Sequence, residues 1–305
     1  MYLGAHLGIA GGLGEAVREA RRIGCDSLQI FSKSPQMWAG PAIAPAAAQE
    51  FRASVRAEGL RATAVHHGYL ANLGSPKPEM LARSRTAFLD ELRRAELLGV
   101  DALIFHPGAH LGSGVEAGLR TLAESLRQAI AAEPDGTVRI LLENAAGQGT
   151  TLGATFEELR TVLDAVAAPA RLGVALDTCH LFAAGNDLRS EEGYGALCDR
   201  VDSVLGRDVV RAFHLNDAKA GLGSHLDRHE NIGRGEIGRP GFARLVRDRR
   251  WAEVPGFLET PLDDRGYARY AEDLATLRSL GPDATRPPAR AARPRRPARR
   301  ASTVK

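Results

Sequence analysis

The chain has few cysteines and no long hydrophobic segment. Only Cys25, Cys179 and Cys198 occur among its 305 residues; three thiols cannot all pair within one chain, and their spacing is not that of a zinc knuckle. No apolar stretch reaches the roughly 20 residues that a membrane-spanning helix needs. The first residues also lack the basic and apolar segments of a secretory signal. We therefore expect no membrane segment and a cytoplasmic location.

Positive charge is scarce outside one short segment. The chain has a net charge of +3, but residues 282–305 hold eight basic residues against one acidic residue, a balance of +7 that leaves −4 for the remainder. This Pro/Ala/Arg-rich segment has no apolar periodicity to offset its ordering entropy, so we expect it to be disordered. Its arginines suit weak attachment to a polyanion such as nucleic acid. A dispensable, composition-biased extension is the alternative.

The chain does contain a series of short apolar runs, each ending at an acidic residue or a histidine. Six runs end in this way, at His66, His106, Glu143, Asp177, His214 and Glu259. Runs of this length are typical of buried parallel strands, and two further strands are expected over residues 2–6 and 27–31. Segments with helical periodicity separate the runs. The pattern predicts an α/β fold, an eight-stranded TIM barrel of about 250 residues, as one domain over residues 1–281 followed by the tail at 282–305.

The residues that end the runs are expected to meet at one rim of the barrel, where the carboxyl ends of the strands lie. Charged groups are rarely buried unless they are paired or bind a metal. His180 follows Asp177 by one helical turn, and Asp227 and His229 alternate in a segment where both can face one side. The candidate metal ligands are His66, His106, Glu143, Asp177, His180, His214, Asp227, His229 and Glu259.

This ligand set indicates a particular chemistry. At three or four protein ligands per ion, these residues suit two or three ions. A set rich in histidine and free of thiolates favours zinc or manganese over calcium or magnesium. Paired ions about 3.5–4 Å apart activate a hydroxide and stabilise a leaving oxygen in phosphoryl displacement. The sequence therefore predicts hydrolysis of a phosphate ester, with the ions also attracting the anionic substrate to an otherwise acidic body.

Five longer motifs carry a family resemblance. They are His106-Pro-Gly108, Glu143-Asn-Ala-Ala-Gly-Gln-Gly149, Asp177-Thr-Cys-His180, His214-Leu-Asn-Asp-Ala-Lys219 and Asp227-Arg-His229. They resemble the endonuclease IV family, the zinc-dependent apurinic/apyrimidinic (AP) endonucleases of base-excision repair. The resemblance extends from about residue 2 to residue 280.

The resemblance implies three zinc ions, with manganese as an alternative at some sites. The first would be bound by His66, His106 and Glu143, the second by Glu143, Asp177, His214 and Glu259, and the third by His180, Asp227 and His229. Glu143 would bridge the first two ions and is the expected catalytic carboxylate. A hydroxide between those ions would attack the phosphorus, and the third ion would stabilise the departing oxygen.

The implied substrate is double-stranded DNA that contains abasic sites or blocked 3′ ends. Cleavage 5′ to an abasic sugar would leave a 3′-hydroxyl and a 5′-deoxyribose phosphate, and blocked 3′ ends would be trimmed. Family members flip the abasic nucleotide into a pocket that excludes a normal base. The resemblance further implies a monomer that associates with the nucleoid when it is bound to DNA.

Three residues match DNA-contacting positions of the family. Tyr69 and Leu70 match residues that enter the minor groove beside the lesion. Gln36 stands in a wedge loop where the family often has arginine. Glutamine can fill the gap in the base stack but lacks the positive charge of arginine. We therefore expect this difference to lower the affinity for the lesion rather than the rate of catalysis. The histidines outside the ligand set, His6, His67, His110 and His225, are not expected to bind metal.

Two alternatives compete with a repair nuclease. A sugar isomerase or epimerase on the related xylose-isomerase-like barrel would use Glu143, Asp177, His214 and Glu259 for a single ion. The five other candidate ligands have no role in such a site. A non-catalytic DNA-binding protein is the second alternative, but a catalytically inactive relic is expected to have lost a ligand, and none is missing.

Overall fold

The apolar runs form the strands of a closed parallel barrel. The computed structural model describes residues 1–281, and the order of its barrel strands is β1-β10-β7-β6-β5-β4-β3-β2. They are β1 (Tyr2–Leu7), β2 (Ser27–Ile30), β3 (Ala62–His66), β4 (Ala102–Phe105), β5 (Arg139–Glu143), β6 (Leu172–Asp177), β7 (Val210–His214) and β10 (Pro255–Leu258). The predicted TIM barrel is confirmed. The tail predicted at residues 282–305 lies outside the described residues.

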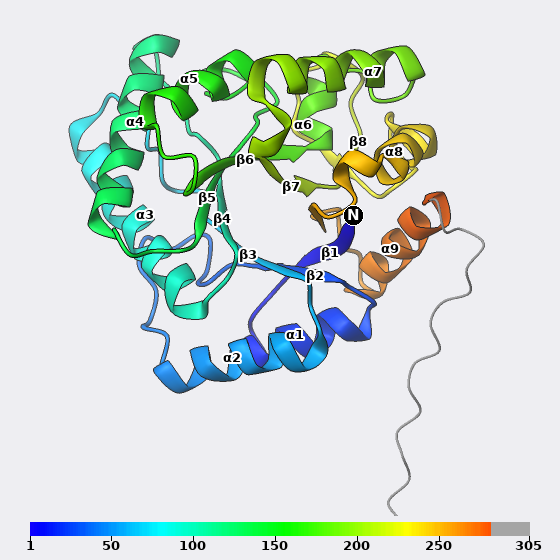
Figure 1. Ribbon diagram of the computed structural model, residues 1–305, viewed down its shortest axis with the longest axis horizontal. Coiled ribbons are helices and arrows are strands. Elements are labelled where there is room, and N and C mark those ends of the chain that lie inside the picture. The colour runs from blue at the N-terminus through cyan, green and yellow to red at the C-terminus, as the bar shows by residue number, and fades with distance from the viewer. Residues whose placement is uncertain (282–305) are drawn as a thin grey trace, which may run out of the picture.

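Helices surround the barrel, which Figure 1 views along its axis. They are α1 (Leu13–Arg22), α2 (Pro45–Glu58), α3 (Pro78–Leu98), α4 (Val115–Ala132), α5 (Phe156–Val166), α6 (Thr178–Ala183), α7 (Glu191–Arg200), α8 (Gly238–Arg247) and α9 (Ala268–Leu280). A π-helical turn, Val201–Leu205, and two 3₁₀ turns, Arg207–Val209 and Arg249–Trp251, complete the helical segments. No helix among residues 1–281 is both long enough and apolar enough to cross a membrane.

Two separate layers of apolar side chains pack against the barrel strands. The larger layer lies between the strands and the surrounding helices. The smaller layer fills the barrel interior and consists of Ala64, Ala102, Ile104, Leu141, Ala175, Ala212 and Phe257. Four of these seven side chains are alanines, which fill less volume than the branched residues that dominate most barrel interiors.

One short antiparallel pair of strands, absent from the sequence-based expectations, carries a candidate ligand. β8 (Asp217–Ala218) pairs with β9 (His229–Glu230), so that Ala218 lies opposite His229. The carboxylate of Asp217 holds the segment that follows, because it accepts hydrogen bonds from the backbone of Gly233 (2.9 Å) and Ile237 (3.0 Å). This pairing brings the long loop after β7 back over the rim of the barrel.

Candidate metal centre

The carboxyl rim of the barrel brings all nine candidate ligands together. They form three groups in which the ligand atoms lie within 4.8 Å of one another: His66, His106 and Glu143; Glu143, Asp177, His214 and Glu259; and His180, Asp227 and His229. These groups are the same three sets that the family resemblance implies. A further group includes Cys179, but burial raises the pKa of its thiol, which disfavours the thiolate that binds metals.

Glu143 occupies the centre of the site. Its Oε2 atom lies 3.1 Å from His66 Nε2 and 3.7 Å from His106 Nδ1, and its Oε1 atom lies 2.9 Å from His214 Nδ1. The side chain is fully buried. One carboxylate with an oxygen directed to each of two groups has the arrangement of a bridging ligand.

Opposite charges balance one another in this buried site. Burial by itself would raise the pKa of the Glu143 carboxyl, but His106 and His214 hold it well below its usual range. Burial would likewise lower the pKa of His214, yet the carboxylates of Glu143 and Glu259 raise it to about 9. The His214 imidazole therefore holds a proton at a position where a metal ion would bind, and a divalent cation would displace that proton.

The third group is assembled from α6, β9 and the loop residue Asp227 just before β9. The Asp177 side chain accepts a hydrogen bond from the backbone of His180 (2.9 Å) and so caps α6. His180 donates from Nδ1 to the Asn144 carbonyl (2.8 Å), which leaves its Nε2 atom 3.2 Å from Asp227 Oδ2. His229 Nε2 lies 3.1 Å from the other Asp227 oxygen.

The donor atoms of this third group fit a bound cation. His229 Nε2 is buried and has no hydrogen-bond partner among the described residues, although a carboxylate oxygen lies 3.1 Å away. Two ligands on one tetrahedral ion with bonds of about 2.0–2.1 Å would be about 3.3 Å apart. Nitrogen and oxygen atoms at this spacing, without hydrogen-bond geometry, fit the ligands of a zinc-like ion.

Polar side chains behind the ligands orient them, and the sequence-based ligand set did not include these residues. Gln29 accepts a hydrogen bond from His214 Nε2 (2.9 Å), which leaves Nδ1 directed to the site, and donates to Glu259 (2.6 Å). Asn216 donates to Asp177 (2.6 Å) and accepts from the backbone of Glu259 (2.9 Å). Outer partners of this kind fix the ring orientation of histidine ligands.

The histidines that were not expected to bind metal stay outside these groups. His6 lies behind the site, with Nδ1 2.9 Å from Glu259 Oε1. His67 is buried against Phe88, and burial lowers its pKa to about 4. His225 donates to the Ala146 carbonyl (3.1 Å), and His110 belongs to none of the groups.

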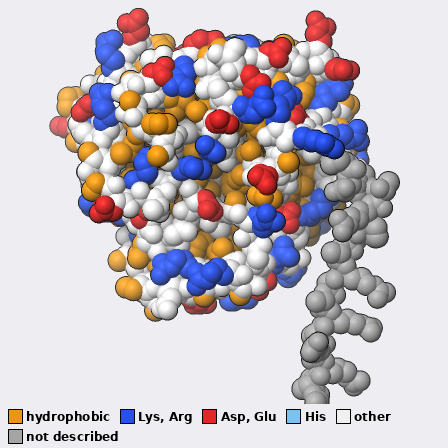
Figure 2. Space-filling view, viewed as in Figure 1, with side chains coloured by type: hydrophobic (Ala, Val, Ile, Leu, Met, Phe, Trp, Pro, Cys, Tyr) orange, Lys and Arg blue, Asp and Glu red, His pale blue; other side chains and the backbone are white. Residues whose placement is uncertain are grey.

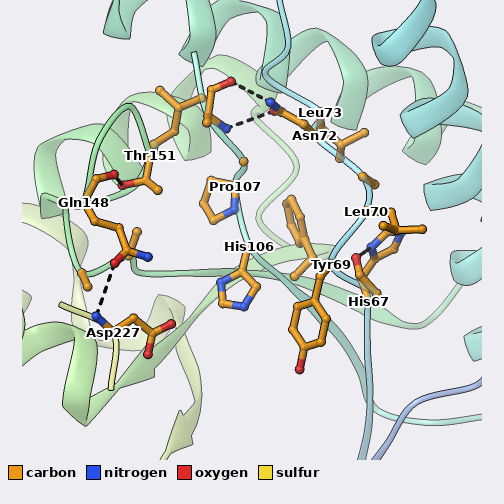
Figure 3. Close-up of a pocket in the computed structure, with 18 of the residues that line it drawn as sticks. His67, Tyr69, Leu70, Asn72, Leu73, His106, Pro107, Gln148, Thr151 and Asp227 are labelled. Atoms are coloured by element: carbon orange, nitrogen blue, oxygen red, sulfur yellow. Dashed lines mark hydrogen bonds between the residues drawn. The ribbon is translucent and has the colours of Figure 1, made fainter. Parts of the chain in front are cut away.

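A cavity of about 360 Å³ opens beside the ligands. Its walls include three ligand side chains, His106, His180 and Asp227, together with Tyr69 and Leu70 from the loop after β3. Figure 3 shows Tyr69 and Asp227 on opposite sides of His106. Tyr69 is 63% exposed, which is unusual for a large aromatic side chain beside a buried cluster. An exposed ring at the mouth of a cavity is suited to contact with a ligand.

A buried ion-pair network supports the loop that contains Gln36. Lys33 pairs with Glu91 and, at 3.1 Å, with Asp90 on α3. Arg94, also on α3, donates to the carbonyls of Ser32 (2.5 Å) and Pro41 (2.9 Å). The base of the loop is therefore tied to α3, while Gln36 at its tip is exposed.

The chain also matches known proteins over most of its length. The family described as the xylose isomerase-like TIM barrel matches residues 17–280. A probable endonuclease 4 of Citrifermentans bemidjiense is 44% identical over 278 residues, which cover 91% of this chain and 98% of the relative.

The chain belongs to the endonuclease IV family. The crystal structure of endonuclease IV from Thermus thermophilus superposes with a TM-score of 0.81 at 36% identity, covering 92% of this chain and 98% of that one. The protein is accordingly a metal-dependent hydrolase of the AP endonuclease class, with a role in DNA repair. A D-tagatose 3-epimerase-like protein has the same fold as the present chain, with a TM-score of 0.67, but the two are only 17% identical.

Proposed function

We propose that this protein hydrolyses the phosphodiester 5′ to an abasic site in double-stranded DNA. The products would be a 3′-hydroxyl and a 5′-deoxyribose phosphate, and blocked 3′ ends would be trimmed by the same site. The observation that carries this proposal is the sharing of Glu143 between two ligand groups, with the third group and an open cavity beside them. Such a cluster suits a reaction in which attacking and leaving oxygens are both stabilised.

The proposed cofactor is three zinc ions, with manganese as an alternative at some sites. When bound, these ions would supply a hydroxide nucleophile at neutral pH and Lewis acidity for the leaving oxygen. The nine ligands would bind in the three groups described above. Gln29 and Asn216 would keep their neighbouring ligands in the productive rotamers, since each contacts two of the strand-terminal segments.

The proposed DNA contacts lie around the mouth of the cavity. Tyr69 and Leu70 are 63% and 37% exposed and line the cavity. We propose that they enter the minor groove beside the lesion, and that the exposed Gln36 fills the gap that the flipped nucleotide leaves in the base stack. The protein would act as a monomer.

A duplex with one tetrahydrofuran abasic analogue tests the proposed reaction. This analogue cannot undergo β-elimination, so cleavage requires hydrolysis of the phosphodiester. We expect one incision, 5′ to the analogue, with a 3′-hydroxyl that a polymerase extends. Elemental analysis of the purified protein should give about three metal ions per chain, from three groups of three or four ligands. An intact duplex, or a single ion per chain, would contradict the proposal.

Introducing arginine at position 36 should strengthen binding to abasic DNA. Gln36→Arg adds one positive charge at an exposed position on a loop whose base is fixed by Lys33 and Arg94. One added phosphate contact steepens the dependence of log affinity on log salt by about one unit. We expect affinity for a tetrahydrofuran duplex to rise about three- to tenfold at low salt, with kcat nearly unchanged. Fluorescence anisotropy at several salt concentrations measures the affinity and its salt dependence.

A matched variant separates this effect from net charge. Gln128→Arg adds the same charge on α4, where, among residues 1–281, the amide of Gln128 donates a hydrogen bond to Glu124 (2.8 Å) on the same helix and to no other residue. It should leave lesion affinity nearly unchanged. Equal gains for both variants would show that Gln36 has no special position on the DNA.

A further inference from the structure

A second cavity lies at the opposite end of the barrel, where the strands begin. Its volume is about 610 Å³, larger than the cavity beside the metal ligands. The small inner side chains Ala64, Ala102 and Ala212, together with Phe257, form its apolar floor. Tyr2, the first residue of β1, contributes an aromatic wall. The cavity exists because alanines at these inner positions leave the barrel interior partly unfilled.

Arginines surround this cavity. Its lining includes Arg61, Arg139, Arg211, Arg249 and Arg250, against the acidic residues Asp101 and Glu253. Figure 2 shows basic side chains, with fewer acidic ones, around apolar atoms near the middle of the face that carries the N-terminus. The rim therefore has a net positive charge, although residues 1–281 carry a net negative charge.

A bulge in β7 directs one of these arginines toward the cavity. Val174 pairs with Val210, but the next residue, Ala175, pairs with Ala212, so Arg211 is an extra residue between them. Arg211 is the one exposed residue in an otherwise buried strand. Bulges of this kind redirect a side chain and are often found at functional sites.

Strand β6 lies between Arg211 on β7 and Arg139 on β5, and a glycine in β6 leaves room for the Arg211 side chain. Gly173 on β6 lies beside it, and a Cβ atom there would be 2.8 Å from the Val209 carbonyl oxygen and 3.1 Å from Arg211 Cγ. On the other side of β6, Arg139 begins β5 and is also exposed. Burial and the nearby Arg139 both lower the pKa of Arg211, as expected for like charges held close together.

Four of the five guanidinium groups lack an acidic partner within residues 1–281, and three of these four have no side-chain hydrogen bond either. Arg250 pairs with Asp248 (2.5 Å), and Arg61 donates to the Tyr2 hydroxyl (3.0 Å). Asp101 is engaged by the backbone of Thr63 (2.7 Å). By contrast, the described part of the chain provides no ion pair for Arg139, Arg211 or Arg249. Their positive charge is therefore available to a ligand.

We propose that this cavity binds a nucleoside 5′-phosphate, with its phosphate groups on Arg139, Arg211 and Arg249 and its nucleoside on the apolar floor. Guanidinium groups bind phosphate oxygens in pairs of charge-assisted hydrogen bonds. The volume falls in the usual range of about 300–1,000 Å³ for small-molecule sites. The apolar floor and the Tyr2 wall favour an anion with an organic part over inorganic phosphate. The site is separate from the metal centre, because the two lie at opposite ends of the strands.

Calorimetric titration of the metal-loaded protein with ADP, pyrophosphate and adenosine tests this site. We expect ADP to bind more tightly than either pyrophosphate or adenosine, since only ADP uses both the arginines and the floor. In the Arg139→Gln/Arg211→Gln variant, affinity for ADP should fall at least about tenfold, because charge-assisted contacts to phosphate are lost. Cleavage of a tetrahydrofuran duplex and the melting temperature should stay close to those of the unmodified protein.

A control variant tests whether the loss of any exposed arginine would weaken ADP binding. Arg120→Gln removes one exposed arginine, 72% accessible, from α4 and should leave ADP binding unchanged. ADP binding that is equal in the double variant would assign the nucleotide to the metal centre and overturn the proposal. Absence of ADP binding to the unmodified protein at millimolar concentration would overturn it as well. The proposal would also be overturned if undamaged duplex DNA, and not ADP, bound to these arginines. That result would indicate a nucleic-acid surface instead.

Discussion

Replacing Glu143 by glutamine should lower the rate of cleavage of a tetrahydrofuran duplex by at least about a thousandfold, since a site built on paired ions depends on both being held together. Glu143 directs one oxygen to His66 and the other to His214. An amide keeps the size of the side chain but offers only one oxygen and no charge. The expected loss is therefore in kcat and in metal content, with a smaller effect on binding of the DNA. Single-turnover gel assays and elemental analysis measure these quantities.

A second substitution controls for the loss of a carboxylate as such. Glu58→Gln changes the last residue of α2, which forms no ion pair within the described residues. It should retain full activity and all of its metal. Because Glu143 is fully buried among histidines, the melting temperature of Glu143→Gln should also be measured in the metal-free state. A folded Glu143→Gln protein that cleaves within tenfold of the unmodified rate would exclude a bridging role for this carboxylate.

Much of the site followed from the sequence because the barrel imposes one direction on its strands. Each apolar run ended at a polar residue, and parallel strands bring such residues to one rim. The pairing of Asp177 with His180 followed from the rise of a single helical turn, and the structure confirms that turn as α6. The strand predicted over residues 27–31 ends one residue earlier, at Ile30, within the usual uncertainty of element boundaries.

Other parts depended on contacts that close the barrel. Gln29 approaches His214 because both strands contribute to the same rim, although 185 residues separate them in sequence. A polar residue within a buried strand was the signal for Gln29. The two-residue strands β8 and β9 are too short to leave a periodic pattern. The bulge at Arg211 was also beyond prediction, because a register shift depends on the neighbouring strand and not on the run itself.

The negative net charge of residues 1–281 opposes DNA binding, and the bound metal ions would offset that charge. Residues 1–281 carry a net charge of −4, and the rim contributes the buried carboxylates Glu143 and Asp177. DNA is a dense polyanion, so this surface alone should repel it. Three divalent ions with one hydroxide would bring the net charge of residues 1–281 to about +1, with the positive charge concentrated at the mouth of the cavity.

Removing the metal ions should therefore weaken binding of abasic DNA as well as stop its cleavage. In the metal-free protein, protons on His214 and His229 would replace part of the lost charge, because nearby carboxylates raise both pKa values to about 9. The net loss is then a few charges, together with direct contacts to phosphate. We expect affinity for a tetrahydrofuran duplex to fall at least about tenfold, equivalent to about 1.4 kcal/mol. Anisotropy titrations before and after chelation, with zinc added back, measure the change.

The contribution of the arginine-rich segment at 282–305 to DNA affinity must be measured separately from that of the metal ions, because its charge of +7 attracts any DNA. On chelation, a chain ending at residue 281 should lose a larger fraction of its affinity for the abasic duplex than the full chain does. The shorter chain lacks the non-specific contribution of the arginine-rich segment. Undamaged duplex provides the matched ligand, and its affinity for the full chain should change less than that of the abasic duplex. Equal affinity of the metal-free and metal-loaded proteins for abasic DNA would show that the ions catalyse cleavage without anchoring the substrate, and that lesion recognition depends on Tyr69, Leu70 and Gln36 instead.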